Sequence, residues 1–434
     1  MERYDRYRDS GVEWIGEIPS NWKILPLKYC YNFKTGFTPD TKQYEYYDPN
    51  GYDWATISDL GGSEIRNTET RISQRFVDEF NPVPILKGSL LYSFKLSTGK
   101  VAFAGKDLFT NEAIASFLPN NPCLCFLKYS SYLISFAANE NIYGAKLLNA
   151  SLIKNALMVF PPISVQEKIA SFLEEKTSVI DSLIQKNEKS IELLQDYRKS
   201  VISEAVTKGL DPNVPMKDSG IEWIGKIPEE WNCFKLLYAL EMPITDGPHE
   251  TPVFYEQGIP FISADAIKNG KVDFSRMRGY ISYEYHLSCS RKYSPKPGDI
   301  YMIKSGATTG QLGYVDFDGV FDIWSPLAAI RVNNGYSSKF LFYALSSDYF
   351  QKQVEEAWSF GTQQNLSMRK LEQLKVVFPK ISVQYEIANY LDSKIIKIDS
   401  LIEKKKQLVE KLQEYRKSLI SECVTGKVKV PGVE

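Results

Sequence analysis

The chain has 434 residues, 43% hydrophobic and 13% aromatic, a composition typical of a folded protein with two or three domains. Its 52 basic and 53 acidic residues give a net charge of −1, so any binding to nucleic acid must rely on local basic patches or on a partner. There is no apolar run long enough to span a bilayer, no signal-peptide core and no disulfide framework, so we expect a cytoplasmic protein.

A repeat dominates the sequence. Each half contains, in the same order, an Asp-Ser-Gly-x-Glu-Trp-Ile-Gly-x-Ile-Pro arm, an Ile-Ser-Val-Gln motif that opens a long helical stretch, and a Tyr-Arg-Lys-Ser motif near its end. Between these blocks lie two segments that match only loosely, which indicates a two-armed scaffold whose specificity lies in the inserts. The repeated blocks are Asp9–Trp22 and Asp218–Trp231, Ile163–Gln166 and Ile381–Gln384, and Tyr197–Ser200 and Tyr415–Ser418.

This pattern predicts an α+β protein in which two mixed α/β domains, related by a pseudo-two-fold axis, are separated by two long helices. Six parts follow from the repeat and the local composition. They are an N-terminal arm (1–22), a first mixed domain (23–162), a central helical spacer (163–209), a linker and second arm (210–231), a second mixed domain (232–380) and a C-terminal helical spacer (381–427).

The two arms are rich in Gly, Pro and Trp. Asp211–Pro215 contains two prolines within five residues, which excludes a helix and indicates a linker. We expect the Trp and Ile side chains of each arm to staple that arm to its neighbouring domain.

Both inserts predict short strands bounded by Gly, Asn and Asp, together with one helix each. The two segments follow the same order of elements, although their loops differ sharply. The first is expected to form strands at Tyr52–Ser58, Ser89–Phe94 and Val101–Ala104 and a helix at Tyr129–Asn139; the second, strands at Ile259–Ser263 and Gly298–Ile303 and a helix at Lys339–Trp358.

The helical stretches, about 166–207 and 384–425, contain no Pro and no Gly and carry apolar residues at a seven-residue spacing. This spacing predicts an antiparallel coiled coil. Each apolar row has one polar residue at its centre, Asn187 in the first and Lys405 in the second. We expect the two to lie close together in the seam; the alternative is that each faces solvent.

Residues that could support catalysis are few. The two histidines, His249 and His286, have no persuasive nucleophile beside them, and Cys123 and Cys125 are better explained as apolar strand residues than as metal ligands. Lys304–Gln311 has glycines like a phosphate loop but lacks the Lys-Ser/Thr after the last Gly. Glu174–Lys176 matches part of a nuclease pattern, but in a helix such charges usually face solvent.

The whole chain resembles the specificity subunit of Type I restriction–modification enzymes. The resemblance rests on the repeated arms, on the Phe160–Gln166 and Phe378–Gln384 starts of the helices, on the paired Tyr-Arg-Lys-Ser ends, and on Gly361-Thr-Gln-Gln-Asn-Leu-Ser367. The first half departs from this pattern, since Gly144-Ala-Lys-Leu-Leu-Asn149 replaces the Gly-Thr-Gln-Gln-Asn stretch.

The resemblance implies that the inserts are target recognition domains, each reading one half of an asymmetric bipartite site in double-stranded DNA. It implies that the helices set the spacing and dock two modification subunits. It further implies no catalytic site and no cofactor in this chain: S-adenosylmethionine would bind the partner modification subunit, and ATP and Mg would bind the restriction subunit.

Base reading needs Arg, Lys, Asn or Gln side chains at base edges, and phosphate contacts add affinity. The loops of the two domains supply the candidates, with Arg276 and Arg278 as further phosphate contacts. Two alternatives stay open, namely a self-contained DNA methyltransferase or nuclease, and a protein-interaction scaffold that does not bind DNA. The candidates are Lys95, Lys100 and Lys146 in the first domain, and Lys304, Ser305, Thr308, Thr309, Gln311, Gln363 and Gln364 in the second.

Overall fold

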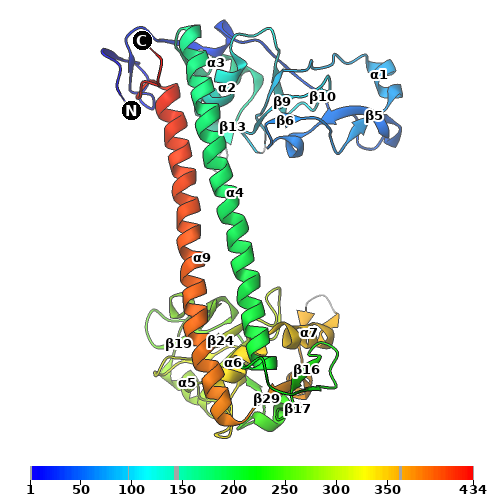
Figure 1. Ribbon diagram of the computed structural model, residues 1–434. Coiled ribbons are helices and arrows are strands. Elements are labelled where there is room, and N and C mark those ends of the chain that lie inside the picture. The colour runs from blue at the N-terminus through cyan, green and yellow to red at the C-terminus, as the bar shows by residue number, and fades with distance from the viewer. Residues whose placement is uncertain (1, 96, 141–145, 361–363, 434) are drawn as a thin grey trace. The chain divides into compact units, whose positions relative to one another are not determined.

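The computed structural model describes residues 2–95, 97–140, 146–360 and 364–433 (Figure 1). Its contacts divide the chain into two compact units, Met1–Asn187 with Leu408–Glu434, and Glu188–Gln407. Each unit therefore contains one arm, one mixed domain and part of each long helix.

The first mixed domain is built on a five-stranded sheet of order β4-β11-β8-β9-β6, beside a three-stranded sheet of order β10-β5-β7. The strands predicted at 89–94 and 101–104 are β8 and β9. Of the strand predicted at 52–58, residues 52–55 form the end of β5, whereas Ile57 and Ser58 belong to a 3-10 helix, Ile57–Asp59. Its elements, with those of the arm, are β1 Tyr7–Asp9, β2 Glu17–Pro19, β3 Lys23–Pro26, β4 Phe33–Thr35, β5 Tyr47–Ala55, β6 Glu64–Ile65, β7 Arg71–Ile72, α1 Gln74–Phe80, β8 Leu90–Ser93, β9 Val101–Ala104, β10 Phe109–Thr110, β11 Ile114–Phe117, α2 Leu124–Ser130, β12 Asn139–Glu140, β13 Lys146–Leu147, α3 Ala150–Asn155 and β14 Leu157–Phe160.

The second mixed domain repeats this plan with a six-stranded sheet of order β18-β26-β23-β24-β21-β20 and a three-stranded sheet of order β22-β19-β25. The predicted strands at 259–263 and 298–303 are β19 and β23. Its elements, with those of the second arm, are β15 Met216–Asp218, β16 Lys226–Pro228, β17 Asn232–Lys235, β18 Thr245–Asp246, β19 Ile259–Ile262, β20 Ile267–Lys268, β21 Gly270–Val272, β22 Gly279–Ile281, α5 Tyr283–Ser290, β23 Ile300–Ile303, β24 Leu312–Tyr314, β25 Asp322–Ile323, β26 Leu327–Ile330, α6 Ser338–Ser346, α7 Asp348–Ala357, β27 Ser359–Phe360, β28 Gln364–Asn365, α8 Met368–Gln373 and β29 Lys375–Phe378.

The helices predicted inside the two domains have different bounds in the structure. In the first domain α2 begins at Leu124, and residues 131–137 form a 3-10 helix instead of an α-helix. The hydroxyls of Ser131 and Ser135 donate to the carbonyls of Lys128 and Tyr132, at 3.1 and 2.7 Å. Such local hydrogen bonds compete with regular helical pairing.

In the second domain a break at Ser347 divides the predicted 339–358 helix into α6 and α7. Ser347 has extended backbone angles (φ −74°, ψ 154°), and its hydroxyl donates to the carbonyl of Ala344 at 2.5 Å. Serine and aspartate are poor residues for a helix interior but good ones at a helix start, which explains the break before Asp348.

The two long helices are α4, Ile163–Lys208, and α9, Ile381–Val424. Both begin at the repeated Ile-Ser-Val-Gln motif, at the first residues of the predicted helical spacers. The glutamines of this motif, Gln166 and Gln384, are buried, and their amides donate to the carbonyls of Pro161 and Pro379 at 2.9 and 2.8 Å. The motif therefore fixes the turn that leads from each domain into its helix.

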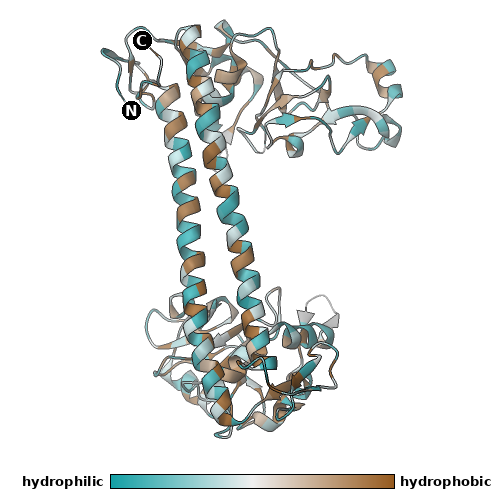
Figure 2. Cartoon of the chain, viewed as in Figure 1, coloured by the Kyte–Doolittle hydropathy of each residue, from teal (hydrophilic) through white to brown (hydrophobic). Residues whose placement is uncertain are grey.

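Within each unit α4 and α9 run side by side, and apolar residues recur along both helices (Figures 1 and 2). Leu173 with Ile180, and Leu391 with Ile398, keep the predicted seven-residue spacing in this seam, and further buried residues lie beside them. In the first unit they include Ile169, Leu173 and Ile180 of α4 with Leu419 and Cys423 of α9. In the second they include Val201, Ile202 and Ala205 of α4 with Ile387, Leu391, Ile398 and Ile402 of α9.

Two ion pairs at equivalent positions of the repeat connect the helices. In the first unit the Arg416 guanidinium donates to both carboxylate oxygens of Asp181, at 2.7 and 3.1 Å. In the second unit Arg198 donates to Asp399 in the same way, at 2.8 and 3.4 Å. Within the first unit the Lys168 ammonium also bonds the carbonyl of Gly432. Residues earlier in α4 therefore face residues later in the chain, so the pairing is antiparallel, as predicted.

Asn187 and Lys405 are both half-buried in the structure. The amide of Asn187 donates to the carbonyl of Leu183 in the preceding turn, at 2.8 Å. The two residues belong to different units. Their mutual proximity therefore stays a prediction.

Each arm closes on the end of the helix that the other half of the repeat supplies. In the first unit Trp22 is buried against the end of α9, where Gly426 adopts φ +74° and a Cβ would overlap Pro19. In the second unit Trp231 lies against Gly209 (φ +81°) at the end of α4. Only glycine suits both the left-handed backbone and the close approach. The packing role predicted for the arms is confirmed for the buried Trp22, Trp231 and the isoleucines beside them, whereas Trp14 and Trp223 are exposed.

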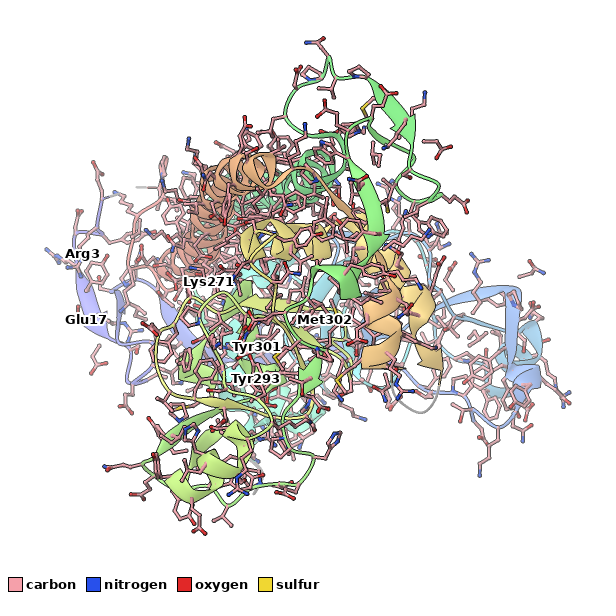
Figure 3. All side chains as sticks on the ribbon, turned by 90° about the horizontal axis from the view of Figure 1, so that it is seen from below. Arg3, Glu17, Lys271, Tyr293, Tyr301 and Met302 are labelled. Carbon is pink, nitrogen blue, oxygen red and sulfur yellow. The ribbon has the colours of Figure 1, made fainter. Side chains whose placement is uncertain are left out.

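The two ends of the described chain meet inside the first unit (Figure 1). The backbone N–H of Lys429 donates to the carbonyl of Glu2 at 2.8 Å, and the Tyr7 hydroxyl donates to the carbonyl of Gly426 at 3.0 Å. Arg3 and Glu17, labelled in Figure 3, form a longer exposed ion pair at 3.9 Å in the same arm.

The interhelical ion pairs give the first testable prediction. Replacing Arg416 by Asp removes one attraction and places two carboxylates together, so we expect a loss of about 1 kcal/mol, the modest value typical of partly exposed pairs. Thermal unfolding followed by circular dichroism should show a lower midpoint for Arg416→Asp. The double variant Asp181→Arg/Arg416→Asp should recover most of the loss, and 1 M salt should shrink the difference. An unrecovered double variant would show that the pair does not act through charge.

Candidate nucleic-acid interface

The Gly-rich loop Lys304–Gln311 connects β23 to β24 in the second domain. It forms a compact turn in which the Thr309 hydroxyl donates to the carbonyl of Gly306 at 2.7 Å and the Gln311 N–H donates to that of Thr308 at 3.1 Å. Thr308 and Gln311 are exposed, whereas Thr309 is half-buried. The loop therefore presents amide and hydroxyl groups, the types that can contact base edges or phosphates.

Lys304 lies inside the domain instead of facing solvent. Its ammonium is 3.1 Å from the carboxylate of Asp246, and the two side chains are only 12% and 1% exposed. Asp246 also accepts a hydrogen bond from Lys292 at 2.5 Å and lies 3.1 Å from His249. The structure thus gives Lys304 an anchoring position at the start of the loop, with its charge already paired.

The ionisation of Asp246 depends on these partners. Burial alone raises the pKa of a carboxyl group, but hydrogen bonds and charges from Lys292 and Lys304 outweigh burial and lower the pKa of Asp246 below its ordinary value near 3.8. Asp246 therefore stays ionised at neutral pH and holds Lys304 and Lys292 together.

Two further ionic groups lie in the interior of this domain. His286 on α5 contacts Asp322 of β25 at 2.6 Å, and burial raises the pKa of Asp322 despite the histidine. Arg331 donates to both oxygens of Asp299 at 2.7 Å. Asp299 also accepts from the hydroxyl of Tyr293, which lies beside Tyr301 in Figure 3. These groups join the two sheets to α5 and to the residues that follow it.

A short hairpin, β27 with β28, lies against the Gly-rich loop. Ser305 forms an isolated bridge with Asn365, and the N–H of Leu366 donates to the carbonyl of Lys304 at 2.8 Å. Gln364 lies in β28, and Gln363 lies outside the described residues. The structure therefore brings the predicted Gly-rich loop together with the β27–β28 hairpin that carries Gln364.

The first domain has the corresponding elements with different side chains. Lys95 follows β8 and lies 3.6 Å from Glu112, both about half exposed. Lys100 is exposed at the end of the same loop, and its backbone N–H donates to the Ser93 hydroxyl at 3.0 Å. Lys146 lies in β13, whose hairpin with β12 takes the place of the β27–β28 hairpin. Within the substituted Gly144–Asn149 stretch, the described residues from Lys146 onward thus occupy the position expected from the repeat.

A groove of about 780 Å³ extends from the Gly-rich loop to the helices of the second unit. Thr309 and Gln311 line it together with basic residues, among them Lys199, Lys268 and Lys406, and with the acidic residues Asp196, Asp399 and Glu403. Sequence reasoning missed these three lysines. For Lys406, the sequence signal was the run Lys404–Lys406 in the second helix. The first helix has Lys186-Asn-Glu188 at the equivalent positions.

The two arginines considered as phosphate contacts are paired with acidic residues. Arg278 lies 3.2 Å from Asp265 and 5.3 Å from the centre of the Trp324 ring. Arg276 lies 3.6 Å from Asp273 on the same short helical turn. Both pairs are solvent-exposed, so both guanidinium groups can still approach a phosphate.

The other residues considered for catalysis make contacts that stabilise the fold. Cys123 and Cys125 lie at the start of α2, although they were expected to lie in a strand. Cys123 adopts φ +29° and immediately precedes the first residue of the helix. Glu174 accepts hydrogen bonds from Lys128 and Tyr129 at 2.7 and 2.6 Å and so joins α4 to the first domain. Among the described residues no group of three or more His, Cys, Asp or Glu could hold a metal ion.

All six cysteines, each within the described part of the chain, are free thiols. No helix in the described ranges is long and apolar enough to cross a membrane.

A duplicated α+β fold with an antiparallel helical spacer and unlike loops at matching places defines a two-site recognition protein. A family model described as "Type I restriction modification DNA specificity domain" matches residues 19–193 and 246–411, and the chain belongs to this family. Each match covers most of one mixed domain and of the helix that follows it. As a member of this family the chain is a DNA-recognition subunit and not an enzyme, as the resemblance implied.

Individual relatives agree with this assignment. The chain is 27% identical to the putative type I restriction enzyme MjaX specificity subunit of Methanocaldococcus jannaschii, with 96% of each chain covered. It is 27% identical to the MjaVIII specificity subunit of the same organism, over 95% of this chain and 94% of the relative. It is 24% identical to the EcoBI specificity subunit of Escherichia coli, over 68% and 64%.

The fold also matches a chain in a solved structure of a type I R-M system, with a TM-score of 0.68 and 15% identity. The match covers 95% of this chain and 99% of that chain. It supports the α+β fold with two long helices.

The buried carboxylate beneath the Gly-rich loop gives the second prediction. Asp246→Asn should destabilise the second domain by about 2 to 3 kcal/mol at pH 7, because Lys304 would lose its partner in a buried position. Since the pKa of Asp246 is lowered by folding, its contribution is complete above the ordinary carboxyl pKa and is lost as the pH falls through the folded value. Urea unfolding from pH 7 to pH 3 should show the two proteins converging at low pH.

A matched control is Asp265→Asn, which removes an exposed partner of Arg278 and should cost less than about 0.5 kcal/mol. If Asp246→Asn costs no more than this control at pH 7, the anchoring role of Asp246 is wrong.

Proposed function

We propose that each mixed domain reads one half of an asymmetric bipartite sequence in double-stranded DNA, and that the long helices set the distance between the two half-sites. The observation that carries this proposal is the duplication itself. The two halves share the arms, the helix starts and the interhelical ion pairs, but they differ in the loops that follow β8 and β23. A protein with internal two-fold symmetry suits a duplex with its own local dyads, and unlike loops make the half-sites unlike.

In the second domain Thr308, Thr309 and Gln311 are the side chains of the Gly-rich loop best placed for DNA contact, with Gln363 and Gln364 as further candidates. Lys304 and Ser305 help to hold these side chains in position at the start of the loop. In the first domain Lys95, Lys100 and Lys146 take this role. The charge of Lys304 is already paired with Asp246. Lys304 is therefore better placed to hold the loop in position than to contact a phosphate.

The helices carry a second apolar stripe that supports the docking of partner subunits. This outer stripe lies about a quarter turn from the seam on each helix and is solvent-exposed. Because the stripe occurs on the same side of both antiparallel helices relative to the seam, it falls on one face of the pair in each unit. The outer stripe consists of Val179, Leu183, Leu408 and Tyr415 in the first unit and Leu193, Tyr197, Tyr390 and Leu401 in the second.

One copy of the outer stripe in each unit offers two docking faces, which supports the proposal of two modification subunits. On this proposal the modification subunits bind S-adenosylmethionine and methylate DNA. Restriction subunits, which use ATP and Mg, complete the complex. The net charge of −1 is then explained by shared DNA contacts, since the partner subunits contribute part of the basic surface.

The experiment that tests the proposed function is single-molecule methylome sequencing of cells that express this chain with its modification subunit. We expect one bipartite motif with two unlike half-sites and a fixed gap. Inserting one helical turn of four residues in α4 and in α9 lengthens each by about 6 Å. Because DNA rises about 3.4 Å per base pair, the gap should grow by one or two base pairs while both half-sites stay unchanged.

An unchanged gap in the insertion variant would contradict the role of the helices in spacing. A self-contained methyltransferase would be indicated by methyl transfer from the purified chain alone. A scaffold without DNA binding would be indicated if the assembled complex showed no preference for the motif over a scrambled duplex.

The outer stripe gives a separate prediction. Leu183→Lys and Leu401→Lys should each weaken binding of the modification subunit at least tenfold, because each places a charge in the middle of an apolar docking face. Analytical ultracentrifugation should show the loss of one partner copy per variant. The control is Glu188→Lys, which introduces the same side chain on the opposite flank of α4 and should leave assembly unchanged.

A further inference from the structure

The two domains differ at one equivalent place, where the strand pair β4–β11 or β18–β26 approaches β10 or β25. The registers make Thr35 equivalent to Asp246 and Phe109 equivalent to Asp322. In both domains a glycine follows the first of these positions, Gly36 or Gly247, where a Cβ would overlap the backbone carbonyl of the strand opposite. The same backbone crossing is thus preserved in both halves.

In the second domain this place is closed by ionic groups. Asp246 pairs with Lys292 and Lys304, and Asp322 pairs with His286. The cavity that remains has a volume of only about 110 Å³.

In the first domain the equivalent residues are uncharged, and an open pocket of about 490 Å³ remains. Volumes of this size are typical of sites for small organic ligands. The pocket is lined by Lys34 and Lys154, by the rings of Phe33 and Phe37, and by apolar residues, and none of its described lining residues is acidic.

A hydroxyl group without a hydrogen-bond partner among the described residues is buried in the wall of the pocket. Thr110 is 1% exposed and lines the pocket, and its Oγ1 has no hydrogen-bond partner among the described residues. A buried hydroxyl without a partner costs about 1 to 3 kcal/mol, so such groups usually meet a ligand or water. The equivalent residue of the second domain is Ile323, which has no hydroxyl group.

The two aromatic rings of the pocket are held in place from behind. Phe37 stacks on Phe76 with a centroid distance of 5.1 Å and an interplanar angle of 19°, and Phe33 contacts Phe117 at 5.4 Å. Rings that are already fixed lose little entropy when a ligand binds.

We propose that this pocket of the first domain binds one nucleotide, with its base against Phe33 and Phe37, its phosphate near Lys34 and Lys154, and a polar base or sugar atom at the Thr110 hydroxyl. Aromatic side chains stack on bases of any sequence, lysine neutralises phosphate as a point charge, and a hydroxyl both donates and accepts. The nucleotide comes either from a DNA strand, as an unstacked residue, or from solution. Only the first source depends on the proposed function.

The test has two arms. In the first, isothermal titration of the purified full-length chain measures binding of dAMP, dTMP, dGMP, dCMP and inorganic phosphate. We expect at least one deoxynucleotide to bind, and the double variant Lys34→Gln/Lys154→Gln to weaken it at least tenfold. Thr110→Val should weaken it about fivefold, while Thr110→Ser, which keeps the hydroxyl, should stay close to the original chain. The control Lys87→Gln changes an exposed lysine of the same domain that does not line the pocket.

In the second arm the assembled complex binds its methylated motif with 2-aminopurine at successive positions of the half-site. A fluorescence increase at one position that disappears in Lys34→Gln/Lys154→Gln assigns the pocket to an unstacked DNA nucleotide. Binding in the first arm without such an increase assigns it to a free nucleotide, and this result stands even if bipartite DNA recognition fails. Equal affinity for inorganic phosphate and nucleotides, or no effect in either arm, overturns the proposal.

Discussion

The pairs Asp181–Arg416 and Arg198–Asp399 tie together helical segments that are far apart in the chain, and they do so twice in the same way. Each pair lies beside an apolar seam, and the ion pair and the seam make different contributions to helix pairing. The buried seam residues supply most of the free energy of helix pairing, since hydrophobic burial contributes far more than partly exposed ion pairs. The arginine geometry adds specificity, because a bidentate contact is satisfied in only one register. Within each unit, that register decides which residues of α4 and α9 face each other.

The two mixed domains show how one backbone plan can hold different chemistry. In the second domain three buried carboxylates, Asp246, Asp299 and Asp322, are paired with Lys, Arg and His from neighbouring elements. In the first domain the positions equivalent to Asp246 and Asp322 are Thr35 and Phe109, and the core there is mainly apolar. The backbone crossing at Gly36 and Gly247 is kept, since the glycines are needed where strands approach closely. Side chains around a fixed crossing can therefore change without altering the framework.

Much of this fold could be predicted from the sequence because the repeat marks its framework. The arms, the two long helices, their antiparallel pairing and the strands at 89–94, 101–104, 259–263 and 298–303 follow from motif spacing and periodicity. The break at Ser347 and the 3-10 segment at 131–137 could not be predicted, because local serine hydrogen bonds outweigh an apolar pattern that suits a helix. The ion pair between Lys304 and Asp246 could not be predicted either. Asp246 lies on a strand distant in sequence, and no charge pattern links the two residues. Only tertiary packing brings the lysines Lys199, Lys268 and Lys406 to the same groove.

The placement of the chain ends has a consequence for synthesis on the ribosome. The second unit, Glu188–Gln407, is continuous in sequence, so all of it is available before the C-terminal segment emerges. The first unit needs Leu408–Glu434 to cover the seam face of α4 and to receive Trp22 at Gly426. Until that segment appears, Ile169, Leu173 and Ile180 lack their α9 partners and remain an exposed apolar strip on a nascent chain. The half that is made first is therefore completed last, and this interval is when the protein is most exposed to misassembly with another copy of the same strip.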